Sequence, residues 1–131
     1  MSSDLQTATS SKTMVWAGRI LSTLPVLMLV MSAVMKLTKH PEVLKGFATM
    51  GWPEYVLVPL GIVELVSTVL YVIPQTAVLG TILLTGYLGG AIATHVRIGE
   101  QFIMQAIFGV VIWLGLYLRD ARVRALIPLR K

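Results

Sequence analysis

The stretch 61-GIVELVSTVLYVI-73 decides the fold class, because it places one carboxylate inside a long apolar run. Glu64 is the only formally charged residue between Tyr55 and Arg97. Apolar runs of about 18 residues or more are typical of membrane spans. A charged side chain near the middle of a bilayer costs several kcal/mol unless it faces the bundle interior and has a partner. We therefore predict that Glu64 lies in a membrane helix and points inward.

The composition of the whole chain also indicates a membrane protein. Its 131 residues are 56% apolar and 13% charged, whereas soluble domains carry about 25% charged residues. The absence of cysteine excludes disulfides, thiolate metal sites and a cysteine nucleophile. The chain has a net charge of +5, and five of its basic residues follow the last apolar run. This distribution favours contact between the C-terminal tail and anionic lipid head groups, and it argues against nucleic-acid binding.

Four apolar runs predict an all-α fold, an integral-membrane antiparallel four-helix bundle. Residues 1–13 are polar and rich in Ser and Thr, which predicts a disordered tail. Residues 14–118 form the expected membrane domain, and residues 119–131 form a basic cytoplasmic tail. The four spans are expected at about residues 15–35, 54–73, 76–97 and 102–118.

The segment between the first two spans mixes apolar and charged residues. Lys39, Glu42 and Lys45 alternate with apolar side chains such as Phe47, which is typical of a short interfacial helix. Of the basic residues in the chain, seven fall on the side of the termini and four on the opposite side. Because positive residues are retained in the cytoplasm, this excess predicts a cell-membrane protein with both termini cytoplasmic.

Polar residues gather in the half of the bundle that lies away from the termini. Helical spacing places Ser32 and Lys36 on one stripe of the first span, and it places Tyr87 and His95 on one stripe of the third. We predict a ligand pocket there, with Glu64 and His95 as candidate acid–base groups. No metal site is expected, because the two histidines lie in different segments. The candidate ligand-binding residues are Ser32, Lys36, Glu64, Tyr87, His95, Gln101 and Gln105.

Each of these residues also has a simpler structural interpretation. Glu64 is equally compatible with a buried salt bridge that fixes helix packing. His95 is compatible with an interfacial position, and Lys36 with a side chain that extends to the head groups. Gly86 and Gly90 form a small-residue stripe, which predicts close helix packing inside the bundle or between protomers.

Four motifs carry a family resemblance: SAVMKL, GFATMGWP, PLGIVEL and GGAIATHVRIGE. Over about residues 15–118 the chain resembles the DoxX-like family of small four-span membrane proteins. The positions that match the pattern of the family are Lys36, Gly51, Glu64 and His95. The resemblance implies an association with redox complexes and with quinone as electron acceptor. Animal proteins similar to the family act as receptor-assembly chaperones. Any thiol-based version of the redox role conflicts with the absence of cysteine.

Three functions stay open from the sequence. The favoured one is a membrane subunit or binding module that holds a lipophilic small molecule, with a quinone as candidate ligand, and that acts with a redox partner protein. No built-in cofactor is expected. The second is an assembly or interaction protein whose polar cluster is structural. The third is a stand-alone enzyme, an isomerase or hydrolase, that uses Glu64 and His95 as acid and base. A second copy of the chain is a further candidate partner.

Overall fold

The computed structural model describes residues 12–127, which form helices joined by short links. Between residues 12 and 127 there is no strand, so the predicted all-α class is confirmed. In chain order the elements are α2 (Lys12–Leu37), α3 (Pro41–Met50), η1 (Glu54–Val56), α4 (Leu57–Val72), η2 (Pro74–Thr76), α5 (Ala77–Arg97), α6 (Ile103–Arg119) and α7 (Ala121–Leu126).

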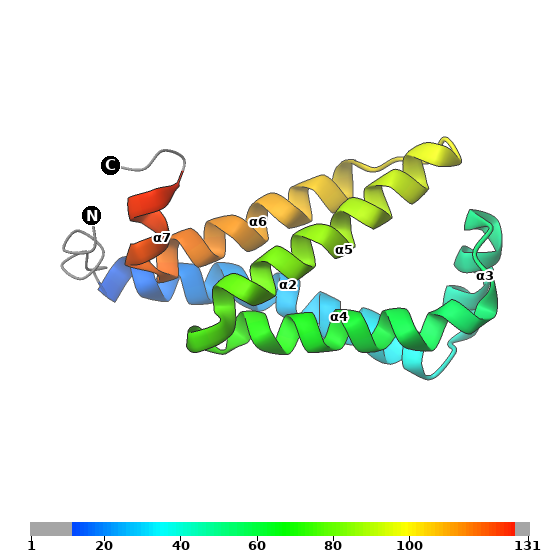
Figure 1. The fold of residues 1–131 in the computed structure, drawn as a ribbon, viewed down its shortest axis with the longest axis horizontal. Coiled ribbons are helices and arrows are strands. Elements are labelled where there is room, and N and C mark those ends of the chain that lie inside the picture. The colour runs from blue at the N-terminus through cyan, green and yellow to red at the C-terminus, as the bar shows by residue number, and fades with distance from the viewer. Residues whose placement is uncertain (1–11, 128–131) are drawn as a thin grey trace.

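The four long helices form an antiparallel bundle (Figure 1). Helix α2 packs against α4 and α6, and α5 packs against the same two helices. The three-residue turn η2 joins α4 to α5, and such a short link requires antiparallel neighbours. Within residues 12–127, three segments are long and apolar enough to cross a membrane: α2, η1 with α4, and η2 with α5. Helix α6 is a shorter apolar helix of 17 residues. The predicted helical bundle is confirmed.

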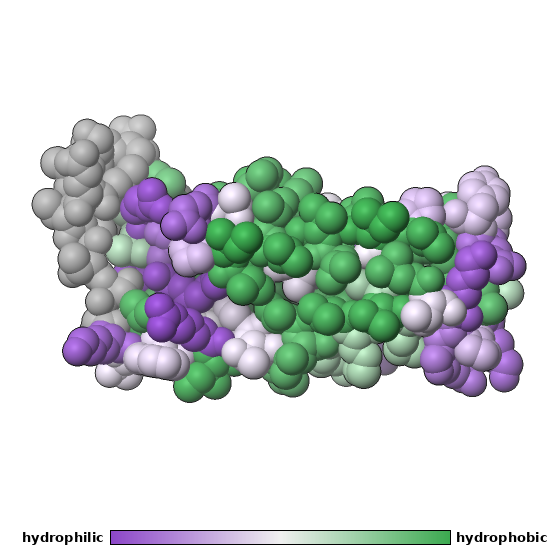
Figure 2. All heavy atoms as spheres, turned by 90° about the horizontal axis from the view of Figure 1, so that it is seen from below, coloured by the Kyte–Doolittle hydropathy of each residue, from purple (hydrophilic) through white to green (hydrophobic). Residues whose placement is uncertain are grey.

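The surface of the molecule has the polarity expected in a bilayer. Figure 2 shows an apolar band in the middle of the visible face and hydrophilic residues at both ends. Large apolar side chains are exposed on several helices, including Leu24 (65%), Val66 (51%) and Ile82 (54%). A contiguous apolar surface of this kind requires lipid rather than water around it. The chain is therefore a membrane protein with apolar spanning helices.

The ends of the described chain differ in detail from the predicted boundaries. Helix α2 begins at Lys12, and residues 1–11 of the predicted tail lie outside the described residues. Helix α6 continues to Arg119. Asp120 then caps α7, because its carboxylate accepts a hydrogen bond of 2.9 Å from the backbone N–H of Arg122. The predicted basic tail thus contains a short helix, and residues 128–131 lie outside the described part.

Tyr71 joins the helices in the half of the bundle that holds the termini. Its hydroxyl donates to the backbone carbonyl of Ile112 at 2.7 Å and lies 3.0 Å from the hydroxyl of Ser22. Gly80 lets α5 approach closely, because a Cβ at this position would overlap the backbone of Tyr71. These contacts hold the helices together at this end. Toward the opposite end α4 and α5 diverge (Figure 1).

Helix α3 lies across the end of the bundle that is opposite to the termini (Figure 1). His40 caps its first turn by accepting a hydrogen bond of 3.2 Å from the backbone N–H of Glu42. Gly51 ends the helix in the left-handed conformation, with φ of 78°, and glycine adopts this conformation without strain. Phe47 is the buried residue of α3. The short helix between the first two spans is therefore present, with its aromatic side directed into the bundle.

Candidate functional site

A cavity of about 650 Å³ occupies the half of the bundle away from the termini, and we call it the polar cavity. Helices α2, α3, α4, α5 and α6 all contribute to its wall. Most of the wall is apolar, as is usual for small-molecule sites, and a few polar groups converge on it. The polar and charged side chains of the wall are Ser32, Lys36, Glu64, Tyr87, Thr94, His95 and Gln105.

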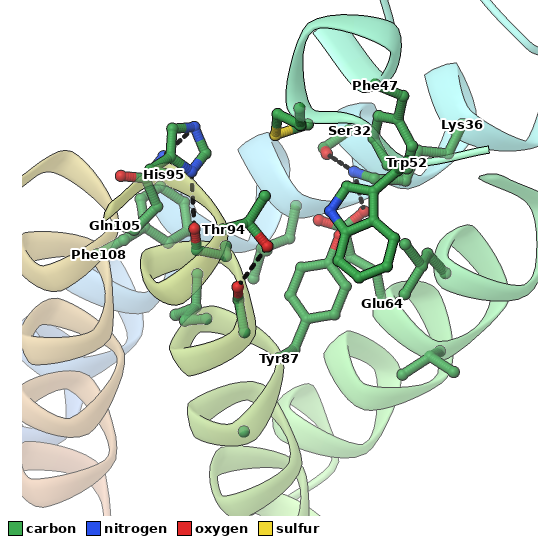
Figure 3. A pocket seen from close by; sticks show the side chains of 18 of the residues that line it. Ser32, Lys36, Phe47, Trp52, Glu64, Tyr87, Thr94, His95, Gln105 and Phe108 are labelled. Carbon is green, nitrogen blue, oxygen red and sulfur yellow. Dashed lines mark hydrogen bonds and ion pairs between the residues drawn. The ribbon is translucent and has the colours of Figure 1, made fainter. Parts of the chain in front are cut away.

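Lys36 and Glu64 form a buried salt bridge across α2 and α4 (Figure 3). The ammonium nitrogen of Lys36 lies 3.1 Å from Oε1 of Glu64, and it donates to the hydroxyl of Ser32 at 2.7 Å. Gly61 permits this approach, since a Cβ there would come within 3.1 Å of the Lys36 Cβ. Both charges are paired, which meets the requirement for ionisable groups inside a membrane.

Tyr87 extends from α5 toward the salt bridge, as Figure 3 shows. The ammonium nitrogen of Lys36 lies 5.8 Å from the centre of its ring, within the range of cation–π attraction. The aromatic ring of Tyr87 therefore faces the pair from the α5 side of the cavity. A ligand beside Tyr87 would meet the ammonium group of Lys36 as a hydrogen-bond donor.

His95 and Gln105 form a second polar group on the opposite wall (Figure 3). Nδ1 of His95 lies 2.7 Å from the carbonyl oxygen of Ala91, so this nitrogen carries the proton and donates. In the neutral ring Nε2 is then an acceptor, and it lies 3.5 Å from the amide nitrogen of Gln105. Oε1 of Gln105 is buried and has no hydrogen-bond partner among residues 12–127. This wall therefore offers acceptors, whereas the Lys36 wall offers a donor.

Helix α3 and the residues after it cover the end of the polar cavity. Phe47, Met50 and Trp52 belong to its wall. Arg97, from the end of α5, donates to the backbone carbonyl of Met50, and its guanidinium lies 5.5 Å from the ring centre of Trp52. These two contacts join the end of α5 to the residues that cover the cavity. The amphipathic pattern of residues 43–52 was the available signal for this cover.

The polar cavity also opens sideways between α4 and α5. Val63, Gly86 and Gly90 line it and are exposed at the surface. A Cβ at either glycine would meet nothing within 4 Å. The expected close helix packing at these glycines is therefore not found inside the bundle. Their small size instead leaves an opening toward the lipid.

The structure brings together six of the seven sequence-predicted ligand-binding residues. Ser32, Lys36, Glu64, Tyr87, His95 and Gln105 all lie on the wall of the polar cavity. Gln101 does not, because it is exposed in the link before α6 begins at Ile103. Thr94 was missed by the sequence reasoning, and its hydroxyl donates to the carbonyl of Gly90 at 2.9 Å. Within residues 12–127, no three His, Cys, Asp or Glu side chains are grouped so that they could hold a metal ion.

Comparison with known proteins gives a family. The model of the DoxX-like family matches residues 20–115, which include Glu64, His95 and most of the four long helices. No curated protein and no solved structure matches the chain. The family match covers well over half of the sequence and agrees with the resemblance carried by its motifs. The chain belongs to the DoxX-like family of membrane proteins.

Proposed function

We propose that this protein is a membrane-embedded binding module that holds a lipophilic small molecule in the polar cavity, and that the molecule is a quinone. One observation carries the proposal. Seven polar or charged side chains from four helices converge on a cavity that is otherwise apolar and open toward lipid. A quinone suits such a site because its ring and tail dissolve in the bilayer while its two oxygens need polar partners.

The two walls of the cavity suggest how a quinone would lie. A quinone oxygen would accept a hydrogen bond from the ammonium group of Lys36, beside Glu64. The hydroxyl of the reduced form would donate to Oε1 of Gln105, which has no hydrogen-bond partner among the described residues, whereas Nε2 of His95 already faces the amide nitrogen of Gln105. Reduction of a quinone to a quinol consumes two electrons and two protons. We assign the electrons to a redox partner protein. The two protons would come from water on the side of the membrane where the cavity lies, taken up and passed on by Glu64 and His95.

The proposal also includes the surroundings of the protein. We propose a position in the cell membrane with both termini in the cytoplasm, which the excess of positive residues at that end supports. The polar cavity would then lie in the half of the bilayer away from the cytoplasm. A second copy of the chain is a further candidate partner, beside the redox protein.

A structural role for the polar cluster is the second candidate, and the salt bridge itself favours it. Lys36 and Glu64 join α2 to α4, so the pair contributes to packing even without a ligand. Under this second hypothesis the protein assists the assembly of partner proteins, and the cavity binds no specific ligand. The two candidates differ in how substitutions affect ligand binding and stability.

Two glutamines provide a matched test. Gln105 lines the cavity, whereas Gln101 is exposed and lies outside it. We would purify the wild type, Gln105→Leu and Gln101→Leu in a non-ionic detergent and titrate each with a short-chain quinol, the form whose hydroxyl can donate to Oε1 of Gln105. Thermal unfolding and quenching of tryptophan fluorescence would report binding. We expect Gln105→Leu to weaken binding about fivefold, the effect of one hydrogen bond, and Gln101→Leu to leave it unchanged.

A lipophilic hydrocarbon without oxygens serves as the control ligand. Under our proposal the quinone stabilises the wild type and the hydrocarbon does not. Equal stabilisation by both would show a purely apolar cavity and would remove the quinone proposal. No response to either, together with loss of folding in Glu64→Gln, would favour the structural role.

A further inference from the structure

A second cavity, of about 820 Å³, lies at the end of the bundle that holds the termini, and we call it the terminal cavity. Residues from α2, α6 and the start of α7 form one part of its wall, and Val72, Pro74 and Ala77 form the rest. It shares no residue with the polar cavity. The charged residues of its wall are Arg19, Arg119, Asp120 and Arg122.

Arg119 is held in place at this cavity by Tyr71 and Gly18. Its guanidinium lies 4.5 Å from the centre of the Tyr71 ring, and one of its N–H groups donates to the Tyr71 carbonyl at 3.2 Å. Gly18 accommodates the side chain, because a Cβ there would overlap Cγ of Arg119. Nε of Arg119 is buried and has no hydrogen-bond partner among the described residues. The guanidinium of Arg119 is therefore held in one position, while its Nε–H group has no acceptor among the described residues.

Arg19 and Arg122 add two exposed cations around the same cavity. The guanidinium of Arg19 lies 5.2 Å from the ring centre of Trp16, an aromatic residue of the kind that sits at membrane interfaces. Nε of Arg122 lies 3.5 Å from a carboxylate oxygen of Asp120. Three arginines and one aspartate leave the wall with a net charge of +2. The terminal cavity therefore attracts anions.

The remaining part of the wall is apolar and reaches the lipid-facing surface. Val15, Val26, Leu27 and Val72 line the cavity. Leu27 (61%) and Val72 (49%) are also exposed on the outside of the bundle. A ligand in this cavity would thus contact cations at its polar end and lipid-facing side chains along its length. A phospholipid has an anionic head group and apolar chains that match these two parts of the wall. A free phosphate ion has no apolar part that could contact the apolar side chains.

We propose that the terminal cavity binds an anionic phospholipid, with the phosphate between Arg19, Arg119 and Arg122 and an acyl chain along Leu27 and Val72. Guanidinium groups match phosphate oxygens in geometry and form two parallel hydrogen bonds with them. Basic pockets between membrane helices on the cytoplasmic side are known to take such head groups. This inference is independent of the quinone proposal, since it concerns the other end of the bundle.

The test uses the full chain in a non-ionic detergent. Native mass spectrometry would count the bound lipids during titration with phosphatidylglycerol, phosphatidylcholine or inorganic phosphate, and thermal unfolding would report stabilisation. We expect one phosphatidylglycerol per chain and a raised Tm, with no matching effect from the other two. The double variant Arg19→Gln/Arg122→Gln removes two exposed cations and leaves Arg119 and Tyr71 intact. We expect it to weaken phosphatidylglycerol binding about 30-fold.

Lys12→Gln is the matched control, because Lys12 is exposed at the same end of α2 and lies outside the cavity. We expect this variant to bind phosphatidylglycerol like the wild type. Equal binding of phosphatidylcholine would overturn the proposal, and so would stabilisation by inorganic phosphate alone. If Lys12→Gln lost as much phosphatidylglycerol binding as the double variant, the proposal would also be overturned. The lipid would then be attracted by the general positive charge of the surface and not by the cavity.

Discussion

The ammonium group of Lys36 and the carboxylate of Glu64 lie 3.1 Å apart in the interior of the bundle, with side chains only 10% and 2% exposed. This contact has two roles that substitution can separate. It joins α2 to α4, and it forms part of the wall of the polar cavity. Loss of one partner leaves an uncompensated charge, which usually costs about 3–5 kcal/mol, whereas apolar replacement of both is often neutral.

We therefore expect Lys36→Met and Glu64→Leu to destabilise the protein by about 3 kcal/mol each. The double variant should recover most of the wild-type stability, because no buried charge remains, yet it should not respond to quinone. Reversible unfolding in mixed detergent micelles would measure the first effect, and quinone titration the second. A double variant that is as unstable as the single variants would contradict this account of the pair.

The opening between α4 and α5 predicts an effect on ligand access. Gly86→Leu should slow quinone association at least several-fold, because the new side chain would narrow the opening. Stability should not fall, since a Cβ there meets nothing within 4 Å. Gly89→Leu is the matched control, because Gly89 is equally exposed and open but does not line the cavity. Stopped-flow fluorescence would measure association. Identical rates in both variants would mean that the ligand enters elsewhere.

The hydroxyl of Tyr71 predicts a stability change in the other half of the bundle. Tyr71→Phe removes the hydrogen bond to the Ile112 carbonyl and the contact with Ser22. We expect a loss of about 1–2 kcal/mol in the free energy of unfolding. Tyr55→Phe should have no effect, because Tyr55 is 79% exposed. If the two variants unfold alike, the Tyr71 hydroxyl does not support the packing of these helices.

The contact of Arg97 with Met50 and Trp52 predicts that it holds α3 over the polar cavity. Arg97→Gln should raise the rate of amide hydrogen exchange within α3 and leave exchange in α6 unchanged. Quinone dissociation should become faster, because the cover of the cavity is looser. Lys45→Gln, at an exposed position on α3 itself, removes a positive charge without touching this contact. Faster exchange in both variants would point to a general charge effect instead.

The sequence predicted most of the fold because membrane spans are a strong signal. A membrane helix needs about 20 apolar residues to cross the bilayer, and the three-residue link between α4 and α5 requires antiparallel neighbours. The inward position of Glu64 followed from the cost of an exposed charge in lipid. Gln101 shows where this reasoning fails. It was predicted to bind a ligand together with Gln105, but α6 begins only at Ile103, so no face of this helix carries both residues.

Other features depended on contacts between helices, which periodicity within one helix does not reveal. The spacing of Gly86 and Gly90 in the sequence is the same whether another helix packs against them or they face the lipid. The position of α3 over the cavity depends on Arg97, which is 47 residues away in sequence from its partner Met50. The sequence placed Arg119 at the start of the basic cytoplasmic tail, because it follows the last apolar run. The structure shows it stacked on Tyr71 instead.

Between the polar cavity and the terminal cavity the bundle is filled by side chains that line neither. Leu84 and Ile112 are the clearest examples, at 0% and 1% exposure. Together with buried hydroxyl residues such as Thr81, at 0% exposure, these side chains form a packed layer that keeps the two cavities apart. A molecule in one cavity therefore makes no contact with the wall of the other. Each end of the molecule could be occupied without regard to the other.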